Sequence, residues 1–185
     1  DRIDATAKKL LGLMPLPNLR NPDGTIPATN NYFVAAPFVL NRHTLDTKVN
    51  LNANQKLNFF GRFSVLDFYT ENGTNFGKEL QGAPLGSSNP GVGNGNTYNF
   101  SVGSTYMLSS NMVMDAHVGF VRMNTGVEQT DIAENKGLNF LGLPGTNGPN
   151  AYEGGTPLFD LDTYADLGTT DTFMPYYRSD DQWQG

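Results

Sequence analysis

The stretch LNFFGRFSV at residues 57–65 alternates in character along almost its whole length. Its odd positions carry apolar side chains or glycine (Leu57, Phe59, Gly61, Phe63 and Val65), and its even positions are mainly polar. A period of two is the pattern of a β-strand whose two faces meet different surroundings. The stretch therefore predicts a strand with one apolar face and one mainly polar face.

Three further stretches, at residues 45–52, 97–108 and 112–120, show the same period. Their mainly apolar faces carry Leu45, Val49 and Leu51, then Tyr98, Phe100, Val102, Tyr106 and Leu108, then Met112, Met114, Ala116, Val118 and Phe120. We expect a fifth strand to begin near Phe173. Together these stretches predict an all-β fold of antiparallel, up-and-down strands.

The connections between these strands are unequal in a regular way. Tight turns at residues 53–56 and 109–111 alternate with long loops rich in small and polar residues, over about 71–95 and 126–171. Short turns at one end and long loops at the other are typical of a transmembrane β-barrel. The strands also exceed the ~5–6 residues usual in soluble sheets and suit the ~9–11 of a tilted membrane strand. The pattern therefore favours part of a transmembrane barrel over a compact soluble domain.

The first residues have a different period. Apolar residues between Ile3 and Met14 follow helical spacing, and Pro15 stops the segment, so we expect one short amphipathic helix. We accordingly divide the chain into residues 1–39, a helix with a Pro/Asn-rich external segment, and residues 40–185, barrel strands with their two long loops.

Composition excludes several classes of function. The 185 residues hold 12 Lys and Arg against 18 Asp and Glu, a net charge of −6, and the basic residues are scattered. A nucleic-acid partner is therefore not expected, because phosphates require clustered positive charge. The chain has no cysteine, which excludes disulfides and thiolate metal sites but says nothing of compartment.

The polar faces of the predicted strands carry the candidate functional residues. We expect five charged or titratable side chains to face a water-filled lumen: Asp46, Lys48, Arg62, Asp115 and His117. Asp115 and His117 share a face, but no serine nucleophile can be assigned to them, so we expect no catalytic residues and no enzyme activity. The only two histidines stand far apart in sequence, so neither a metal site nor a cofactor is expected.

Other motifs have simpler interpretations. The stretch DLDTYAD at residues 160–166 spaces carboxylates like a calcium loop, but it lacks the glycine and glutamate of an EF-hand and fits a solvated acidic loop better. Residues 91–95, GVGNG, have no helix or lysine after them and predict a flexible external loop. Aromatic residues near the loop ends of the strands predict an interfacial girdle: Tyr69, Tyr98, Tyr176, Tyr177 and Trp183.

An ordered set of short motifs resembles the Oar-like TonB-dependent outer-membrane receptors. These motifs are Arg2-Ile3-Asp4, Leu10-Leu11, Met14-Pro15-Leu16-Pro17-Asn18, Asn30-Asn31-Tyr32, Asp46-Thr47-Lys48-Val49, Phe60-Gly61-Arg62-Phe63-Ser64, Tyr106-Met107-Leu108-Ser109-Ser110 and His117-Val118-Gly119-Phe120-Val121-Arg122. Each motif is weak by itself. Their order matches the family across nearly the whole chain.

The resemblance implies a plugged barrel in the cell outer membrane of a Gram-negative type. Such a receptor takes up a large nutrient (a glycan, a peptide or a metal chelate), is surrounded by outer-membrane lipid, and is energised by TonB. The family's plug domain, TonB-contact segment and final aromatic-terminated strand have no counterpart here, so we expect a fragment of the barrel region. TonB would then act through the plug region of the parent, which lies outside this sequence.

Two alternatives remain open from the residues alone. The first is a secreted β-sandwich or adhesin-like binding module that uses its Asn/Gly-rich loops. The second is an extracellular glycan-acting enzyme, which is weaker because no motif places a pair of carboxylates.

Overall fold

The computed structural model describes residues 2–73, 76, 91–160, 162, 167–168 and 174–185. Contacts within the chain divide it into two units. The strand unit comprises Leu40–Thr70, Gly93–Gly126 and Tyr176–Gly185, and the loop unit comprises Asp1–Val39, Glu71–Val92 and Val127–Pro175.

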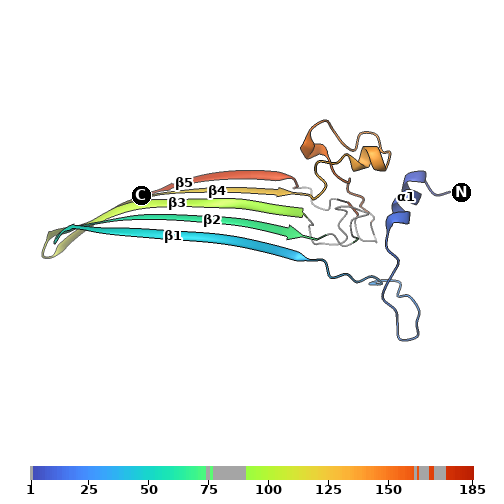
Figure 1. Ribbon diagram of the computed structural model, residues 1–185, viewed down its shortest axis with the longest axis horizontal. Coiled ribbons are helices and arrows are strands. Elements are labelled where there is room, and N and C mark those ends of the chain that lie inside the picture. Colours follow the sequence, from blue (N-terminus) through green and yellow to red (C-terminus); the bar gives the residue numbers. More distant parts are fainter. Residues whose placement is uncertain (1, 74–75, 77–90, 161, 163–166, 169–173) are drawn as a thin grey trace. The chain divides into compact units, whose positions relative to one another are not determined.

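Five long strands form one sheet in the order β1-β2-β3-β4-β5 (Figure 1). They are β1 (Phe38–Asn54), β2 (Leu57–Asn72), β3 (Gly91–Ser109), β4 (Met112–Glu128) and β5 (Tyr176–Gln184). Every strand is hydrogen-bonded to its neighbours in sequence, so the antiparallel, up-and-down prediction is confirmed. Among the residues described, β1 and β5 are the two edges, and the sheet is not closed.

The strands extend further than the alternation predicted. β2 continues to Asn72 and β3 begins at Gly91, so the loop expected at residues 71–95 starts later and ends earlier. The stretch Gly91–Gly95, predicted as a flexible loop, is the first part of β3. A Cβ atom on Gly91 would lie 2.3 Å from the carbonyl oxygen of Glu128, which shows how closely the backbone of β4 approaches. Glycine in this stretch thus allows close strand pairing instead of marking a loop.

Short polar turns connect β1 to β2 and β3 to β4. In the first turn, the Asn54 side chain accepts a hydrogen bond of 2.8 Å from the backbone N–H of Lys56. In the second, the Ser109 hydroxyl donates to the Asn111 side chain over 2.8 Å. The first bond satisfies a backbone N–H of its turn and the second joins two side chains, and both turns lie at the predicted positions.

Contacts between neighbouring strands define two faces of the sheet. One, which we name the polar face, holds the even-numbered side chains of β1 and β2 and the odd-numbered ones of β3 and β4, because Asp46 contacts Arg62 and Thr105 contacts Asp115. The other, which we name the belt face, holds the odd-numbered side chains of β1, β2 and β5 and the even-numbered ones of β3 and β4. There the rings of Phe120 and Trp183 lie 4.7 Å apart.

The helix α1 spans Ala5–Leu13 in the loop unit, two residues shorter at its start and one at its end than the predicted 3–14. Asp4 caps it by accepting hydrogen bonds from the backbone N–H groups of Thr6 and Ala7. Its buried residue, Leu10, belongs to the core of this unit together with Phe76, Leu141 and Leu167. No helix in the described residues is long and apolar enough to cross a membrane.

The segment after α1 contains a compact turn at Asn21–Thr25. The backbone N–H of Thr25 donates to Asp23 over 2.9 Å, and the Thr25 hydroxyl donates to the same oxygen over 2.6 Å. These hydrogen bonds stabilise the carboxylate, and they hold the pKa of Asp23 below its usual value. The turn is thus organised by its own side chains.

Candidate functional site on the polar face of the sheet

The first group on the polar face joins β1 to β2. The Arg62 guanidinium lies 3.3 Å from a carboxylate oxygen of Asp46, and the Ser64 hydroxyl donates to the same carboxylate. Both charged side chains are about half exposed, so the pair adds at most about 1 kcal/mol. Its main effect is to hold opposite charges side by side on one face.

An aromatic residue interrupts this polar row for a packing reason. The Lys48 ammonium lies 5.5 Å from the centre of the Phe60 ring, and the same ring covers Gly103 on β3. A Cβ atom on Gly103 would lie 2.5 Å from the Phe60 ring, so only glycine leaves room for it. Phe60 therefore shields exposed strand backbone, as aromatic residues do beside glycine in sheets.

The second group on the polar face joins β3 to β4. The Thr105 hydroxyl donates to Asp115 over 2.5 Å, and His117 lies two residues further along β4 on the same face. The five predicted lumenal residues thus share one face, but they form separate groups on β1–β2 and on β4. Among the residues that the structure describes, no three His, Asp or Glu side chains are placed to hold a metal ion.

This arrangement suits contact with water and polar solutes. Opposite charges and hydroxyl groups repeat across four strands without converging on one point. The polar face therefore suits contact with water along its length.

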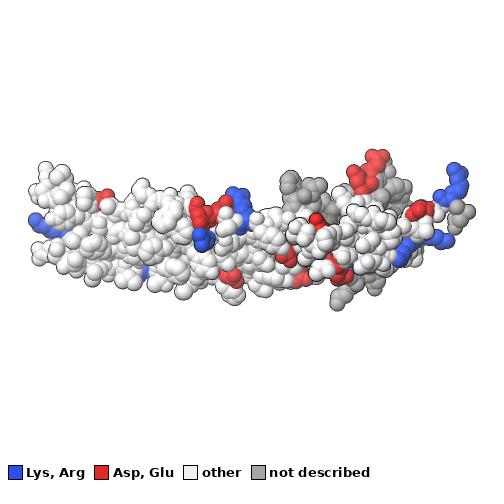
Figure 2. Space-filling model, turned by 90° about the horizontal axis from the view of Figure 1, so that it is seen from above, with Lys and Arg blue, Asp and Glu red and all other residues white. Residues whose placement is uncertain are grey.

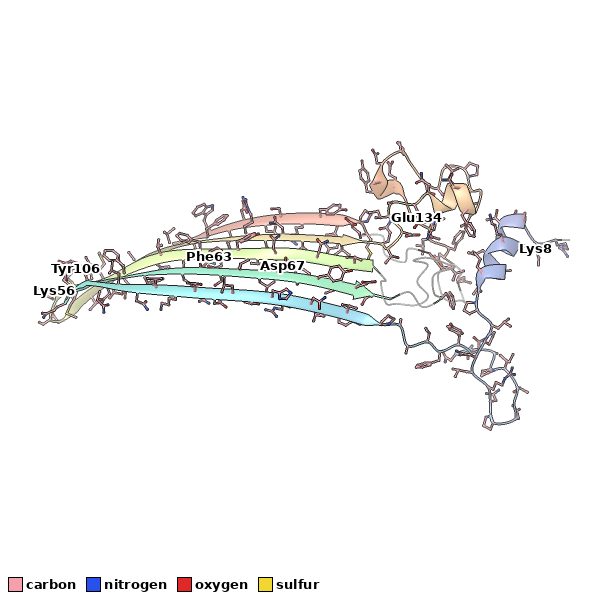
Figure 3. The ribbon with its side chains drawn as sticks, in the orientation of Figure 1. Lys8, Lys56, Phe63, Asp67, Tyr106 and Glu134 are labelled. Atoms are coloured by element: carbon pink, nitrogen blue, oxygen red, sulfur yellow. The ribbon has the colours of Figure 1, made fainter. Side chains whose placement is uncertain are left out.

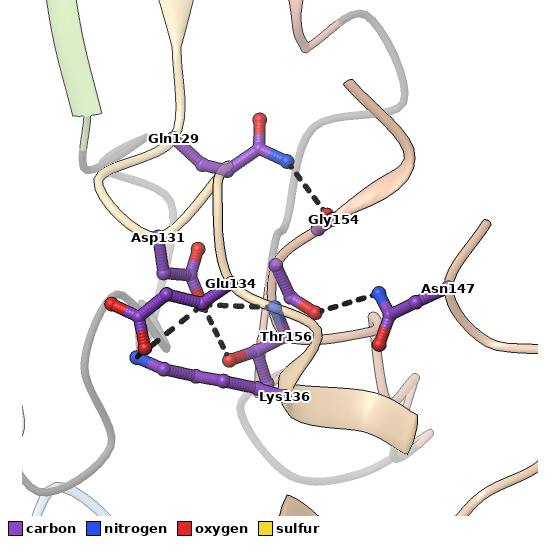
Figure 4. A network of polar contacts seen from close by, with 8 residues as sticks. Gln129, Asp131, Glu134, Lys136, Asn147, Gly154 and Thr156 are labelled. Atoms are coloured by element: carbon purple, nitrogen blue, oxygen red, sulfur yellow. Dashed lines mark hydrogen bonds and ion pairs between the residues drawn. The ribbon is translucent and has the colours of Figure 1, made fainter. Parts of the chain in front are cut away.

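The loop unit contains a buried polar network that sequence reasoning missed (Figure 4). Asp131 is 2% exposed and accepts hydrogen bonds from the Thr156 backbone N–H (2.9 Å) and hydroxyl (2.7 Å). The Lys136 ammonium lies 3.8 Å from the same carboxylate oxygen and 3.4 Å from Glu134. The partners are up to 25 residues apart, and no local motif connects them.

Further hydrogen bonds extend this network through the long connection between β4 and β5. The Gln129 amide donates to the Gly154 carbonyl over 3.3 Å, and the Asn147 amide donates to the Gly155 carbonyl over 3.0 Å. A neighbouring groove of about 550 Å³ is lined by both apolar and polar residues, including Leu10, Phe140, Leu141 and Lys136. The stretch at residues 160–166, expected to be a solvated acidic loop, lies mostly outside the described residues.

The belt face changes character along the strands (Figure 3). Near the tight turns it carries apolar side chains, which we name the apolar belt: Leu45, Val49, Leu51, Leu57, Phe59, Phe63, Val65, Tyr98, Phe100, Val102, Tyr106, Leu108, Met112, Met114, Ala116, Val118, Phe120 and Trp183. Phe59 and Phe63 are both 42% exposed and Phe100 is 50% exposed. An apolar surface of this extent requires an apolar partner.

Beyond the belt, toward the long connections, the same face carries a polar rim. Its members are Asp67, Asn94, Asn96, Arg122, Asn124, Tyr177, Ser179 and Asp181. On the face that Figure 2 shows, the charged side chains of the described residues occur in small groups among uncharged ones. In the rim, Arg122 and Asp181 form a two-pronged ion pair with distances of 2.7 and 2.6 Å. Except for Tyr177, which was expected among the aromatic residues at the loop ends, alternation did not predict this rim, because the apolar alternation ends before it.

The predicted aromatic girdle does not form one ring on one face: Tyr69 lies near the loop end of β2 on the belt face, whereas Tyr176 lies on the polar face of β5. Tyr98 lies on β3 between apolar Phe100 and polar Asn96, where the belt meets the rim. Tyr177 lies at the loop end of β5. Trp183 lies near the other end of β5 and packs on Phe120, so it belongs to the belt and not to the loop end of the strand.

Sidedness can be tested by cysteine labelling of the intact barrel in membranes. We expect a water-soluble thiol reagent to modify Asn58→Cys and Asp115→Cys, because both positions lie on the polar face. Phe59→Cys and Met114→Cys should be spared, since they lie in the apolar belt. Each pair differs by one residue along a strand, so depth is matched. The opposite pattern, or equal modification of all four, would refute the assignment of faces.

Comparison with known proteins gives one family. The family model described as "Outer membrane beta barrel domain" matches residues 1–185. No curated protein and no solved structure matches the chain.

Proposed function

The chain belongs to the outer membrane β-barrel domain family, and from this premise we propose that it is part of the wall of a TonB-dependent receptor. It is a β-barrel protein of the outer membrane. The match over the whole chain is the observation that carries the membrane assignment. The narrower proposal concerns the kind of barrel and what passes through it.

The dimensions of the apolar belt agree with a bilayer. In β2 the belt covers about nine residues, which at ~3.3 Å each and a tilt of about 40° span roughly 23 Å. The apolar band of an outer-membrane barrel is ~25 Å tall. The belt face is therefore assigned to lipid, and the polar face to the lumen with Asp46, Lys48, Arg62, Asp115 and His117.

The ordered motifs support a receptor that depends on TonB. They include Arg2-Ile3-Asp4 before α1, Phe60–Ser64 in β2 and His117–Arg122 in β4, in the order found in Oar-like receptors. In this proposal the parent barrel imports a large nutrient such as a glycan, a peptide or a metal chelate. TonB engages a plug region outside this sequence, and the polar face lines the passage.

The proposed role is binding and passage without catalysis. Asp115 is hydrogen-bonded by Thr105, and Asp46 is occupied by Arg62 and Ser64, so neither carboxylate group is arranged as an acid–base pair. A secreted β-sandwich is not favoured, because such a fold covers its apolar face with a second sheet. The strands described here form a single sheet.

Binding to TonB tests the proposal directly. The intact protein, purified in detergent, should bind the purified periplasmic domain of TonB, measured by isothermal titration calorimetry. The same protein without its plug region is the control and should not bind. If the intact protein shows no binding, the TonB-dependent mechanism is wrong, while its place in the outer membrane stands.

A second expectation follows from the two edges of the sheet. An open sheet leaves unpaired N–H and C=O groups on β1 and β5, and in lipid each such group costs several kcal/mol. In water the apolar belt is an exposed patch that favours association. The 185-residue chain expressed alone should therefore aggregate or require detergent.

Size-exclusion chromatography with light scattering, run without detergent beside circular dichroism, measures this behaviour. The intact parent barrel in detergent is the control and should elute as a folded monomer. A sharp monomeric peak of the isolated chain with cooperative unfolding would contradict the proposal that it completes a larger barrel.

A further inference from the structure

The polar rim encloses a hollow on the belt face of the strand unit. The hollow has a volume of about 490 Å³, and its lining includes Asp67, Asn94, Asn96, Asn124, Gly126 and Tyr177. This volume lies within the ~300–1,000 Å³ range of small-molecule sites. The residues that line it come from β2, β3, β4 and β5, so the sheet itself builds the hollow.

Cross-strand contacts hold the polar groups of this hollow in a row. The Asn124 amide donates to the Asn96 side chain over 2.9 Å, and the Ser179 hydroxyl donates to the Asn124 side chain over 2.8 Å. These three side chains therefore form one hydrogen-bonded ladder across β3, β4 and β5. An amide has two donor hydrogens and an acceptor oxygen, so such a ladder keeps further donor and acceptor capacity for a ligand.

Tyr177 supplies an apolar surface at one side of the hollow. Its side chain lies over Gly126, where a Cβ atom would be 3.1 Å from the ring. Tyr177 is nevertheless 65% exposed, so much of its surface is accessible. An exposed aromatic ring beside amide and carboxylate groups is the chemistry that recognises a saccharide: C–H groups of a sugar ring pack on the aromatic face, and sugar hydroxyls bind the amides.

The neighbouring charges argue against a phosphate as the main ligand. The Arg122 guanidinium makes a bidentate ion pair with the Asp181 carboxylate. The Arg178 guanidinium lies 2.5 Å from a carboxylate oxygen of Asp180. The lining of the hollow includes both the paired Arg178 and the negatively charged Asp67. An anion would meet a carboxylate and cations that are already paired. A neutral sugar would instead meet the amide ladder and the Tyr177 ring.

The position of the hollow identifies the source of the saccharide. Along β4 and β5 the belt face passes from Phe120 and Trp183 to Arg122 and Asp181, and then to Asn124 and Ser179. The hollow is thus continuous with the apolar belt on the same face. A molecule whose acyl chains contact the belt presents its headgroup at the rim.

We propose that this hollow binds the saccharide headgroup of a glycolipid in the outer leaflet of the outer membrane. The inference uses the lipid assignment of the belt and does not depend on TonB or on the imported nutrient. The glycolipid would fix the depth of the barrel in the membrane through neutral hydrogen bonds and ring packing, without a cationic cluster.

The test uses the intact barrel in nanodiscs that contain a glycolipid with a neutral oligosaccharide headgroup, and a phospholipid with the same acyl chains is the comparison. Native mass spectrometry after transfer to detergent measures how many glycolipid molecules remain bound. We expect the glycolipid to be retained about tenfold more strongly than the phospholipid. Tyr177→Ala should remove about a tenfold preference, a typical effect of one aromatic contact.

Two further variants keep the result independent of folding defects. Tyr176→Ala changes the neighbouring tyrosine on the opposite face of β5 and should retain the preference. Asn94→Ala removes one amide of the lining and should weaken the preference without removing the ring. Barrel folding of each variant is checked by its resistance to unfolding in detergent.

Several outcomes would overturn the proposal. One is equal retention of both lipids by the wild-type protein, and another is an equal loss in Tyr177→Ala and Tyr176→Ala. Binding of the same oligosaccharide in soluble form as tightly as the glycolipid would assign the hollow to a free sugar instead. TonB binding is measured separately, so the glycolipid result can be interpreted even if the receptor proposal fails. The labelling of residues 59 and 114 independently tests whether the belt face contacts lipid.

Discussion

Phe63→Arg should lower the free energy of unfolding of the intact barrel by about 2–4 kcal/mol, the cost of a cation near the middle of the bilayer. Phe63 lies in the apolar belt, four residues before Asp67 and the start of the polar rim on β2 (Figure 3). In lipid the guanidinium loses its hydration, and the nearest water lies beyond the belt. Reversible unfolding by urea in lipid vesicles measures the effect.

A variant at a similar depth but on the other face separates the effect of lipid contact from that of the added charge. Asn99→Arg places the same side chain on β3, one residue from Phe100 but on the polar face. If that face lines a wet lumen, Asn99→Arg should change the free energy of unfolding by less than about 1 kcal/mol, as expected for an exposed charge. Equal losses in the two variants would show that the two faces of the sheet do not differ in solvent.

The period of two was sufficient to predict the architecture. It identified four strands and their two faces, because the belt residues occupy alternate positions and the residues between them are mainly polar, and the tight turns indicated the antiparallel order. The same signal ends at Val65 and Phe120, where the belt ends. The strands themselves continue to Asn72 and Glu128 through backbone hydrogen bonds, which leave no apolar pattern in the sequence.

Glycine-rich stretches caused the main error in the predicted strand boundaries. Gly91–Gly95 read as a loop because its composition is that of flexible segments, whereas the structure uses it as strand. A Cβ atom on Gly95 would lie 2.6 Å from the Phe68 ring, and one on Gly103 would lie 2.5 Å from Phe60. Each of these glycines makes room for an aromatic ring on the next strand. Such pairings depend on register, which a single sequence does not specify.

For the candidate functional residues, the sequence predicted the face on which they lie but not their contacts. The sequence was sufficient to assign five residues to one face, because the face of a strand residue follows from its odd or even position along the strand. These residues are Asp46, Lys48, Arg62, Asp115 and His117. Their partners could not be assigned, since Asp46 finds Ser64 and Asp115 finds Thr105 only through strand register. Two further sets of contacts could not be predicted from the sequence for the same reason. They are the network of Asp131 and Thr156 and the ladder of Asn96, Asn124 and Ser179.

The packing of Phe60 on Gly103 leads to the second large effect. Gly103→Val adds a side chain whose first atom would lie 2.5 and 2.7 Å from two ring carbons of Phe60, and 2.9 Å from the Ala116 carbonyl oxygen. The ring can rotate only partly, and the carbonyl belongs to the strand backbone. We expect a loss of about 1–3 kcal/mol in the free energy of unfolding, the usual cost of overpacking.

Two controls decide whether that loss comes from this contact. Gly61→Val makes the same change on β2, where a Cβ atom would have nothing within 4 Å, so it should alter the free energy of unfolding by less than about 0.5 kcal/mol. Phe60→Ala combined with Gly103→Val should lose less than the sum of the single variants, because the small side chain removes the ring from the clash. The remaining loss should reflect the Ala116 carbonyl, which neither change moves. Additive losses, or an equal effect of Gly61→Val, would mean that the stability of β3 does not depend on the ring lying over Gly103.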